Sequence, residues 1–136
     1  GLLDLDGESA LTAAQRELAE EADLTAARWD VLGEFYTSPG GSDEAIRIYL
    51  ARDLAPAPET FARDAEEADI EVRWASLDEV VDAILDRRVQ NPSLVVGALA
   101  AHAARARDWS TLAPADTPWD RRPRPIRDAA AEAAAP

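Results

Sequence analysis

The chain of 136 residues is long enough for one domain with its own core and too short for two. Its formal net charge of −13 disfavours nucleic acid as a partner, and the absence of cysteine excludes disulfides and thiolate metal sites. No apolar run approaches the roughly 20 residues of a membrane span, so we expect a cytoplasmic protein that binds neither nucleic acid nor a membrane.

The first predicted element is a helix over residues 10–22 with Ser9 as its N-cap. Apolar residues at helical spacing give this helix one apolar face, which consists of Leu11, Ala14, Leu18 and Ala22. Strands are expected over residues 29–36 and 45–51, and the turn SPGGSD lies between them. The second strand alternates apolar and polar side chains, which is the pattern of a strand with one buried face.

The second half of the chain predicts a loop, a strand and two helices. Residues 55–68 contain prolines and acids without periodicity, and loops of that length are usually functional or disordered. A third strand is expected over residues 70–75, followed by a helix around residues 77–86. The pair Asn91-Pro92 then predicts the start of a helix that runs to about Arg107.

The last helix should bury one apolar face, and the chain after it should end in a tail. The predicted face comprises Leu94, Val95, Ala98, Leu99 and His102. Residues 120–136 lack core side chains, so we expect a disordered tail after a domain over residues 1–119.

The beginning of the sequence predicts that structure is missing upstream. The chain has no methionine at position 1, and its first element is a helix with nothing before it to pack against. Three strands also make a poor sheet. We therefore expect this chain to be part of a longer protein whose preceding strands complete the sheet.

Three carboxylates crowd the end of the first predicted helix. Glu17, Glu20 and Glu21 stand at positions i, i+3 and i+4, so their side chains share one face. Their mutual repulsion and the negative end of the helix dipole both disfavour this arrangement. A solvated acidic face is the plain interpretation, whereas a bound divalent cation would offset the repulsion. Oxygen ligands without histidine or cysteine favour Mg²⁺ or Mn²⁺.

The spacing of these residues resembles the Nudix box, Gly-x5-Glu-x7-Arg-Glu-U-x-Glu-Glu-x-Gly-U, in which U is a bulky aliphatic residue. The chain reads Gly1, six residues, Glu8, seven residues, and then RELAEEADL from Arg16 to Leu24. It departs from the pattern by one extra residue before Glu8 and by Asp23 in place of the glycine. We therefore expect Asp23 to adopt the left-handed backbone conformation that glycine usually fills.

This resemblance implies an α/β fold, the Nudix α/β/α sandwich with a mixed sheet, whose N-terminal strands would lie upstream of the chain. It also implies an enzyme that hydrolyses a diphosphate linked to another moiety. By position, Glu17 and Glu21 would be metal ligands, Glu20 a further ligand or supporting carboxylate, and Arg16 the residue that orients them. Bound Mg²⁺, or Mn²⁺, would neutralise the substrate's oxygens and help to generate hydroxide.

The turn between the predicted strands resembles that of the ADP-ribose pyrophosphatase group of the family. Pro39 follows Leu24 by 15 residues (39 − 24) within an SPGGS-acid sequence. The resemblance implies that the substrate contacts Leu2, Ser38, Pro39, Gly40 and Glu44. It further implies a homodimer. Without this context, the same sequence is simply a tight turn.

Two acidic residues in the predicted loop are the candidates for the catalytic base. The resemblance assigns this role, or that of an extra metal ligand, to Glu67, and Glu66, one position earlier, is the competing candidate. The plain alternative is a solvated acidic loop.

These resemblances predict a Mg²⁺-dependent ADP-ribose pyrophosphatase that produces AMP and ribose 5-phosphate. Two alternatives remain open at this point. The first is an enzyme that acts on another nucleoside diphosphate sugar, and the second is a protein that retains the box but only binds nucleotide or a partner.

Overall fold

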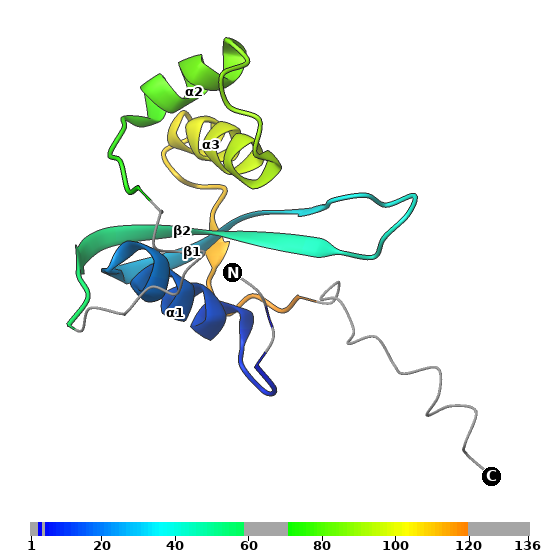
Figure 1. The fold of residues 1–136 in the computed structure, drawn as a ribbon, viewed down its shortest axis with the longest axis vertical. Helices are drawn as coiled ribbons and strands as arrows, with labels where there is room; N and C mark the ends of the chain where they lie inside the picture. The colour runs from blue at the N-terminus through cyan, green and yellow to red at the C-terminus, as the bar shows by residue number, and fades with distance from the viewer. Residues whose placement is uncertain (1–2, 4, 59–70, 120–136) are drawn as a thin grey trace.

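The computed structural model describes residue 3 and residues 5–58 and 71–119 (Figure 1). These residues form three helices and three strands. They are α1 (Ala10–Ala22), β1 (Leu24–Tyr36), β2 (Ala45–Pro56), α2 (Leu77–Leu85), α3 (Pro92–Arg105) and β3 (Ala113–Pro114).

The first helix has the predicted bounds. The hydroxyl of Ser9 accepts a hydrogen bond from the backbone N–H of Thr12 at 3.0 Å, which satisfies one of the free donors at the start of α1. At its other end the helix stops at Asp23, whose backbone N–H donates to the carbonyls of Ala19 and Leu18. The cap residues thus define α1, as the sequence predicts.

Strands β1 and β2 form a long antiparallel hairpin. Leu24 lies opposite Pro56 and Tyr36 opposite Ala45, with an irregularity between Val31 and Gly33. Both strands extend further than the alternating apolar pattern predicts. Cross-strand ion pairs involve the added residues: Arg28 binds Asp53, and Arg52 in the added part of β2 binds Asp30. Pairs of opposite charge across a ladder stabilise strands that apolar alternation does not reveal.

A third strand of two residues completes the described sheet. Ala113 and Pro114 pair with Val31 and Asp30 of β1, which gives the order β2-β1-β3. The sequence predicts a mixed sheet, but every strand pair among the described residues is antiparallel. A strand of two residues that includes proline carries no period-two pattern, and the sequence could not predict it.

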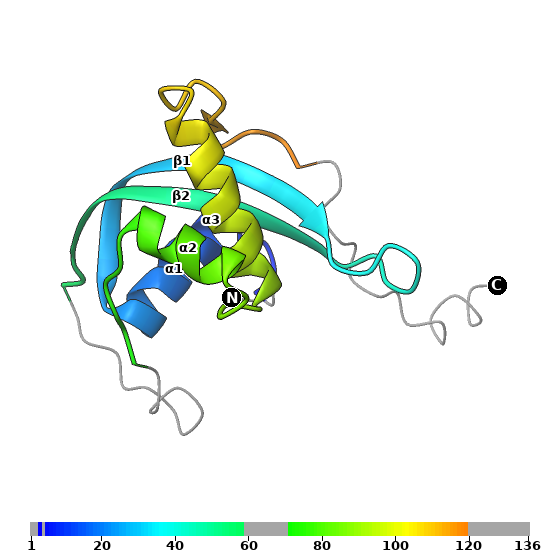
Figure 2. The ribbon, with the colours of Figure 1, turned by 90° about the horizontal axis from the view of Figure 1, so that it is seen from above.

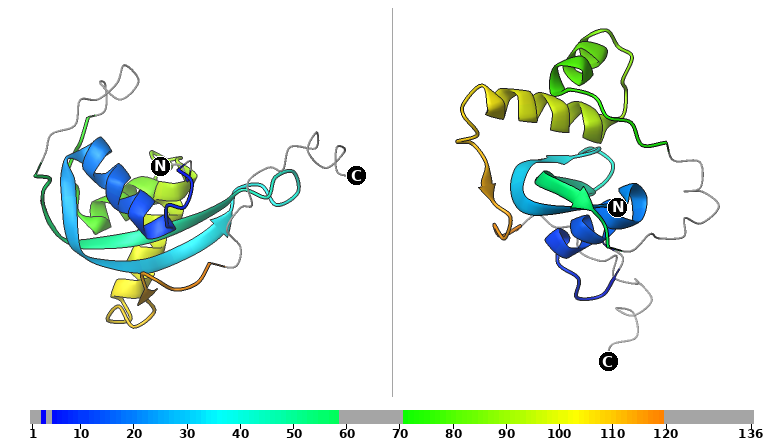
Figure 3. Two further views of the ribbon diagram at one scale, coloured as in Figure 1. Left: turned by 90° about the horizontal axis from the view of Figure 1, so that it is seen from below. Right: turned by 90° about the vertical axis from the view of Figure 1, so that its left-hand side faces the viewer.

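The helices cover both faces of the hairpin. Figure 3 shows α1 on one face of the hairpin and α3 on the other, with α2 packed on the outer side of α3. Seen from above, α3 crosses the curved hairpin while α1 lies beneath it (Figure 2). The described residues thus form a helix–sheet–helix arrangement, and the second half of the sequence that resembles the Nudix box lies in α1.

The core consists of small side chains. Its most buried members are Ala13, Val31, Val81, Ala98, Ala101 and Ala104. A Cβ atom added at Gly97 would lie 3.5 Å from Ile48 Cγ2, so α3 rests closely on β2. The predicted apolar face of α3 is therefore partly wrong. Small residues form the contact that close packing requires, while Leu94, Leu99 and His102 are exposed.

The strand predicted over residues 70–75 is a second correction. Residues 71–76 have no regular secondary structure, and Val72 and Trp74 are 46% and 75% exposed. A strand needs a neighbour for its backbone hydrogen bonds, and no described strand pairs with this segment.

The two helices that follow this segment, α2 and α3, begin where the sequence predicts. Ser76 and Glu79 form a reciprocal capping box at the start of α2, and Asn91 caps α3.

Candidate active site

Arg16 is the centre of a charged cluster on α1. Its Nε and Nη2 donate to the two carboxylate oxygens of Glu8 at 3.2 and 3.3 Å. Its Nη1 donates to Glu20 Oε2 at 2.8 Å and lies 3.1 Å from Glu17 Oε1. One guanidinium therefore holds three carboxylates of the box together.

This cluster is partly withdrawn from water. The side chains of Glu8 and Glu17 are 10% and 18% exposed, and that of Arg16 is 27% exposed. The pKa of Arg16 is raised, chiefly by its hydrogen bonds with Glu8 and Glu20. Partial burial weakens the screening of these pairs, so the guanidinium acts as a permanent counter-ion to the carboxylates.

The helix spacing brings the predicted metal ligands to one face of α1. Glu17, Glu20 and Glu21 span one turn, and Glu21 is exposed. Their oxygens are the donor type that Mg²⁺ prefers, and a positive charge already stands among them. In residues 3, 5–58 and 71–119, however, no three His, Asp or Glu side chains are arranged to hold a metal ion. Glu17 and Glu20 instead face Arg16.

Asp23 adopts the left-handed conformation expected at the end of the box. Its φ and ψ are 54° and 36°, and its carbonyl accepts a hydrogen bond from Ala57 N at 2.8 Å. The same hydrogen bond ties the end of β2 to the end of α1. The residue that replaces the family's glycine is thus both the cap of the helix and its connection to the chain that leads into residues 59–70.

Replacing Asp23 with glycine should raise the free energy of unfolding by about 0.5–1 kcal/mol, because glycine fits a left-handed backbone without strain. Urea denaturation of the two proteins measures the difference. Asp23→Asn serves as the control, since asparagine removes the charge but keeps a similar side chain. A glycine variant no more stable than the asparagine variant would show that the backbone at Asp23 carries little strain.

The turn predicted to contact substrate lies apart from this cluster. Figure 1 shows it at the far end of the hairpin from the C-terminal end of α1 (Figure 1). Thr37 closes the turn through its hydroxyl, which donates to Glu44 Oε2 at 2.6 Å. Ser38 O accepts from the N–H groups of Gly41 and Ser42, so the backbone folds on itself around Pro39 and Gly40. The described contacts of these residues are within the turn.

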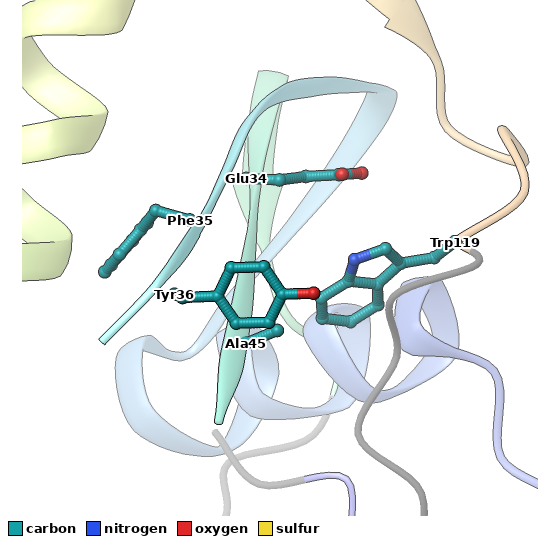
Figure 4. A pocket seen from close by; sticks show the side chains of 5 residues that line it. All are labelled: Glu34, Phe35, Tyr36, Ala45 and Trp119. Atoms are coloured by element: carbon teal, nitrogen blue, oxygen red, sulfur yellow. The ribbon is translucent and has the colours of Figure 1, made fainter. Parts of the chain in front are cut away.

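A shallow depression adjoins the turn. It is lined by Glu34, Phe35, Tyr36, Ala45 and Trp119. Figure 4 shows the Tyr36 side chain pointing to the side on which Trp119 lies, while Phe35 points the other way. Trp119 comes from the segment after β3, so two distant parts of the chain form this surface.

Three predicted site residues lie outside the described residues: Leu2, Glu66 and Glu67. The chain leaves the described part just after Ala57, which is hydrogen-bonded to Asp23. Glu66 stands nine positions after Ala57 (66 − 57), a span of at most about 30 Å.

Sequence reasoning did not assign a role to Glu8 or to Arg47. Glu8 belongs to the box pattern, and its spacing from Arg16 was the available indication. Arg47 contacts Glu34 and Trp119 from near the start of β2, and no local pattern could have revealed this.

Within the described ranges, no helix is long and apolar enough to cross a membrane.

Comparisons with known proteins agree with the box. The NUDIX domain family model matches residues 1–95. An "ADP-ribose pyrophosphatase" of Mycobacterium tuberculosis is 39% identical over 123 residues, which cover 90% of this chain and 58% of that protein. A protein of the same name from Bacillus subtilis is 35% identical over 83 residues, covering 61% and 44%.

A third relative carries a different name. The "Methanol dehydrogenase activator" of Bacillus methanolicus is 31% identical over 90 residues, which cover 66% of this chain and 48% of that protein. The chain thus spans about half the length of the curated relatives it matches.

Proposed function

This chain belongs to the Nudix family, and from that membership we propose that it forms part of a Mg²⁺-dependent enzyme that hydrolyses ADP-ribose to AMP and ribose 5-phosphate. The observation that carries the proposal is the cluster around Arg16. Three carboxylates of the box meet one guanidinium, two from α1 and one, Glu8, from just before it, and two of the three are less than one-fifth exposed. A merely solvated acidic face would leave these side chains in water.

We assign the metal to the carboxylates of α1. Glu17 and Glu21 would hold Mg²⁺, or Mn²⁺, and Glu20 would be a further ligand or a supporting carboxylate. The bound ion would supply neutralisation of the diphosphate and a more acidic water. Arg16 keeps Glu17 and Glu20 on the same side of the helix, and Glu8 holds Arg16 in place through two hydrogen bonds.

We assign the general base to Glu67, with Glu66 as its competitor. The hydrogen bond between Ala57 and Asp23 supports this assignment, because it starts the intervening chain beside the end of the box helix. A base must come within hydrogen-bond reach of the water whose proton it takes. A chain of nine or ten residues from Ala57 is long enough to bring a glutamate to the carboxylates of α1.

The choice of ADP-ribose rests on two relatives and on the turn. Two of the three relatives reported above bear the name ADP-ribose pyrophosphatase. We propose that Leu2, Ser38, Pro39, Gly40 and Glu44 contact the substrate. Because the turn lies away from the C-terminal end of α1, this assignment fits the homodimer that the resemblance implies better than a single copy of the chain.

A second candidate is hydrolysis of another nucleoside diphosphate derivative. The relative named as a methanol dehydrogenase activator supports it, because a related sequence of similar identity carries a different name. The chemistry at the box would be unchanged, and only the contacts at the turn would differ.

Initial rates with ADP-ribose, ADP-glucose and a diadenosine polyphosphate, each with and without Mg²⁺, distinguish these functions. We expect the highest kcat/KM with ADP-ribose and a loss of at least about a hundredfold when the metal is removed. A higher kcat/KM with another substrate would favour the second candidate. Binding of nucleotide without turnover of any substrate would contradict both.

A further inference from the structure

Arg47 is the most buried charged side chain among the ion pairs of the described residues. Its side chain is 4% exposed, although it comes from β2, whose outer edge faces no described strand. Burial lowers the pKa of this guanidinium, but its interactions with Tyr49 and Glu34 outweigh that effect and raise the pKa. A charge removed from water in this way needs several strong partners.

Besides Tyr49 on its own strand, the partners of Arg47 belong to two segments that are far apart in the sequence. Nε and Nη2 of Arg47 donate to Glu34 Oε1 at 2.8 and 2.6 Å, across the hairpin. Nη1 donates to the carbonyl of Thr117 at 2.7 Å, and Nη2 donates to that of Pro118 at 3.1 Å. The guanidinium also lies 5.0 Å from the centre of the Trp119 ring. Arg47 therefore joins the hairpin to the segment after β3.

This junction lies at the base of the turn. Arg47 pairs in register with Glu34, and two positions further along the ladder Tyr36 pairs with Ala45. Directly beyond them, Thr37 N donates to Glu44 O at 3.2 Å and closes the turn. Trp119 and Tyr36 both line the depression, so the segment that Arg47 holds forms one wall of it next to the turn (Figure 4).

We propose that Arg47 is a positioning residue that fixes Trp119 and Glu34 at the base of the turn and thereby holds residues 37–44 in the conformation that receives substrate. This inference rests on the proposed function of the turn. The planar guanidinium suits the task, because it can bind a carboxylate, two carbonyls and an aromatic ring at once. Lysine could make only some of these contacts.

Arg52 provides a matched control within the same strand. It also combines an ion pair with an aromatic contact, since its Nη2 binds Asp30 Oδ2 and its guanidinium lies 5.7 Å from the Trp109 ring. Its side chain is 25% exposed, and it stands five residues further from the turn than Arg47 (52 − 47). An effect of general strand stability should therefore appear in both variants, and an effect on the turn in only one.

Hydrogen exchange by mass spectrometry and steady-state kinetics on Arg47→Ala and Arg52→Ala test the proposal. In Arg47→Ala, amides in residues 37–44 and 113–119 should exchange about tenfold faster. KM for ADP-ribose should rise about tenfold with kcat within about twofold, because the turn acts in binding. In Arg47→Lys, the exchange rates and KM should lie between those of Arg47→Ala and the wild type. Arg52→Ala should leave exchange in residues 37–44 unchanged.

Two results would overturn the proposal. Unchanged exchange in residues 37–44 of Arg47→Ala would mean that Arg47 only ties down the C-terminal segment. Equal acceleration in Arg52→Ala would mean that the strand as a whole had weakened. If Arg47→Ala does not fold, Arg47→Lys carries the same comparison. Exchange needs no turnover, so a failure of the proposed hydrolysis would leave this test intact.

Discussion

Glu17→Gln and Glu21→Gln should each lower kcat with ADP-ribose at least about a hundredfold at saturating Mg²⁺, because a neutral amide is a poor ligand for a hard cation. Calorimetric titration with Mn²⁺ should show weaker binding in both variants. Asp82→Asn, an exposed carboxylate on α2, is the control and should match the wild type in both measurements.

Without metal, the same variants should be as stable as the wild type or more stable by a few tenths of a kcal/mol, because each removes repulsion between carboxylates on one face of α1. In Glu17→Gln, the loss of the contact with Arg16 at 3.1 Å offsets part of that gain. Thermal unfolding in chelator measures both. A wild-type rate in either variant at saturating Mg²⁺ would contradict the assignment of the ligands.

Glu67→Gln should lower kcat at least about a hundredfold with little change in KM, as expected for a group that acts in the transition state. Glu66→Gln should have a smaller effect, and it serves as the matched control because it differs by one position in the same segment. Steady-state kinetics with ADP-ribose measure both variants. Small and equal effects would assign the two residues to a solvated acidic loop.

The parts of the fold that follow local rules could be predicted from the sequence. Ser9 and Asp23 mark the ends of α1 because a cap and a left-handed residue depend on a few neighbouring positions. The i, i+3, i+4 spacing likewise predicts that the box carboxylates share a face. Their common partner, Arg16, follows from the same helical geometry.

The parts that depend on distant segments could not be predicted. Strands β1 and β2 are longer than their apolar pattern because cross-strand ion pairs extend them. Residues 71–75 alternate like a strand, yet no described strand pairs with them. The buried face of α3 consists of alanines because the helix approaches Ile48 closely, which the periodicity of larger residues does not reveal.

The site shows the same division. The Nudix box is local, so the residues around Arg16 are found from the sequence. The depression beside the turn is lined by both Tyr36 and Trp119, two residues that are 83 positions apart (119 − 36). Only the folded chain brings them together, through the guanidinium of Arg47.

The products formed from ADP-ribose test the central claim most directly. The purified protein is incubated with ADP-ribose and Mg²⁺, and the nucleotides and sugar phosphates are separated by chromatography and identified by mass. The proposed function predicts equal amounts of AMP and ribose 5-phosphate, with neither formed in excess chelator. Intact ADP-ribose after incubation with Mg²⁺, or products formed equally fast without metal, would contradict it.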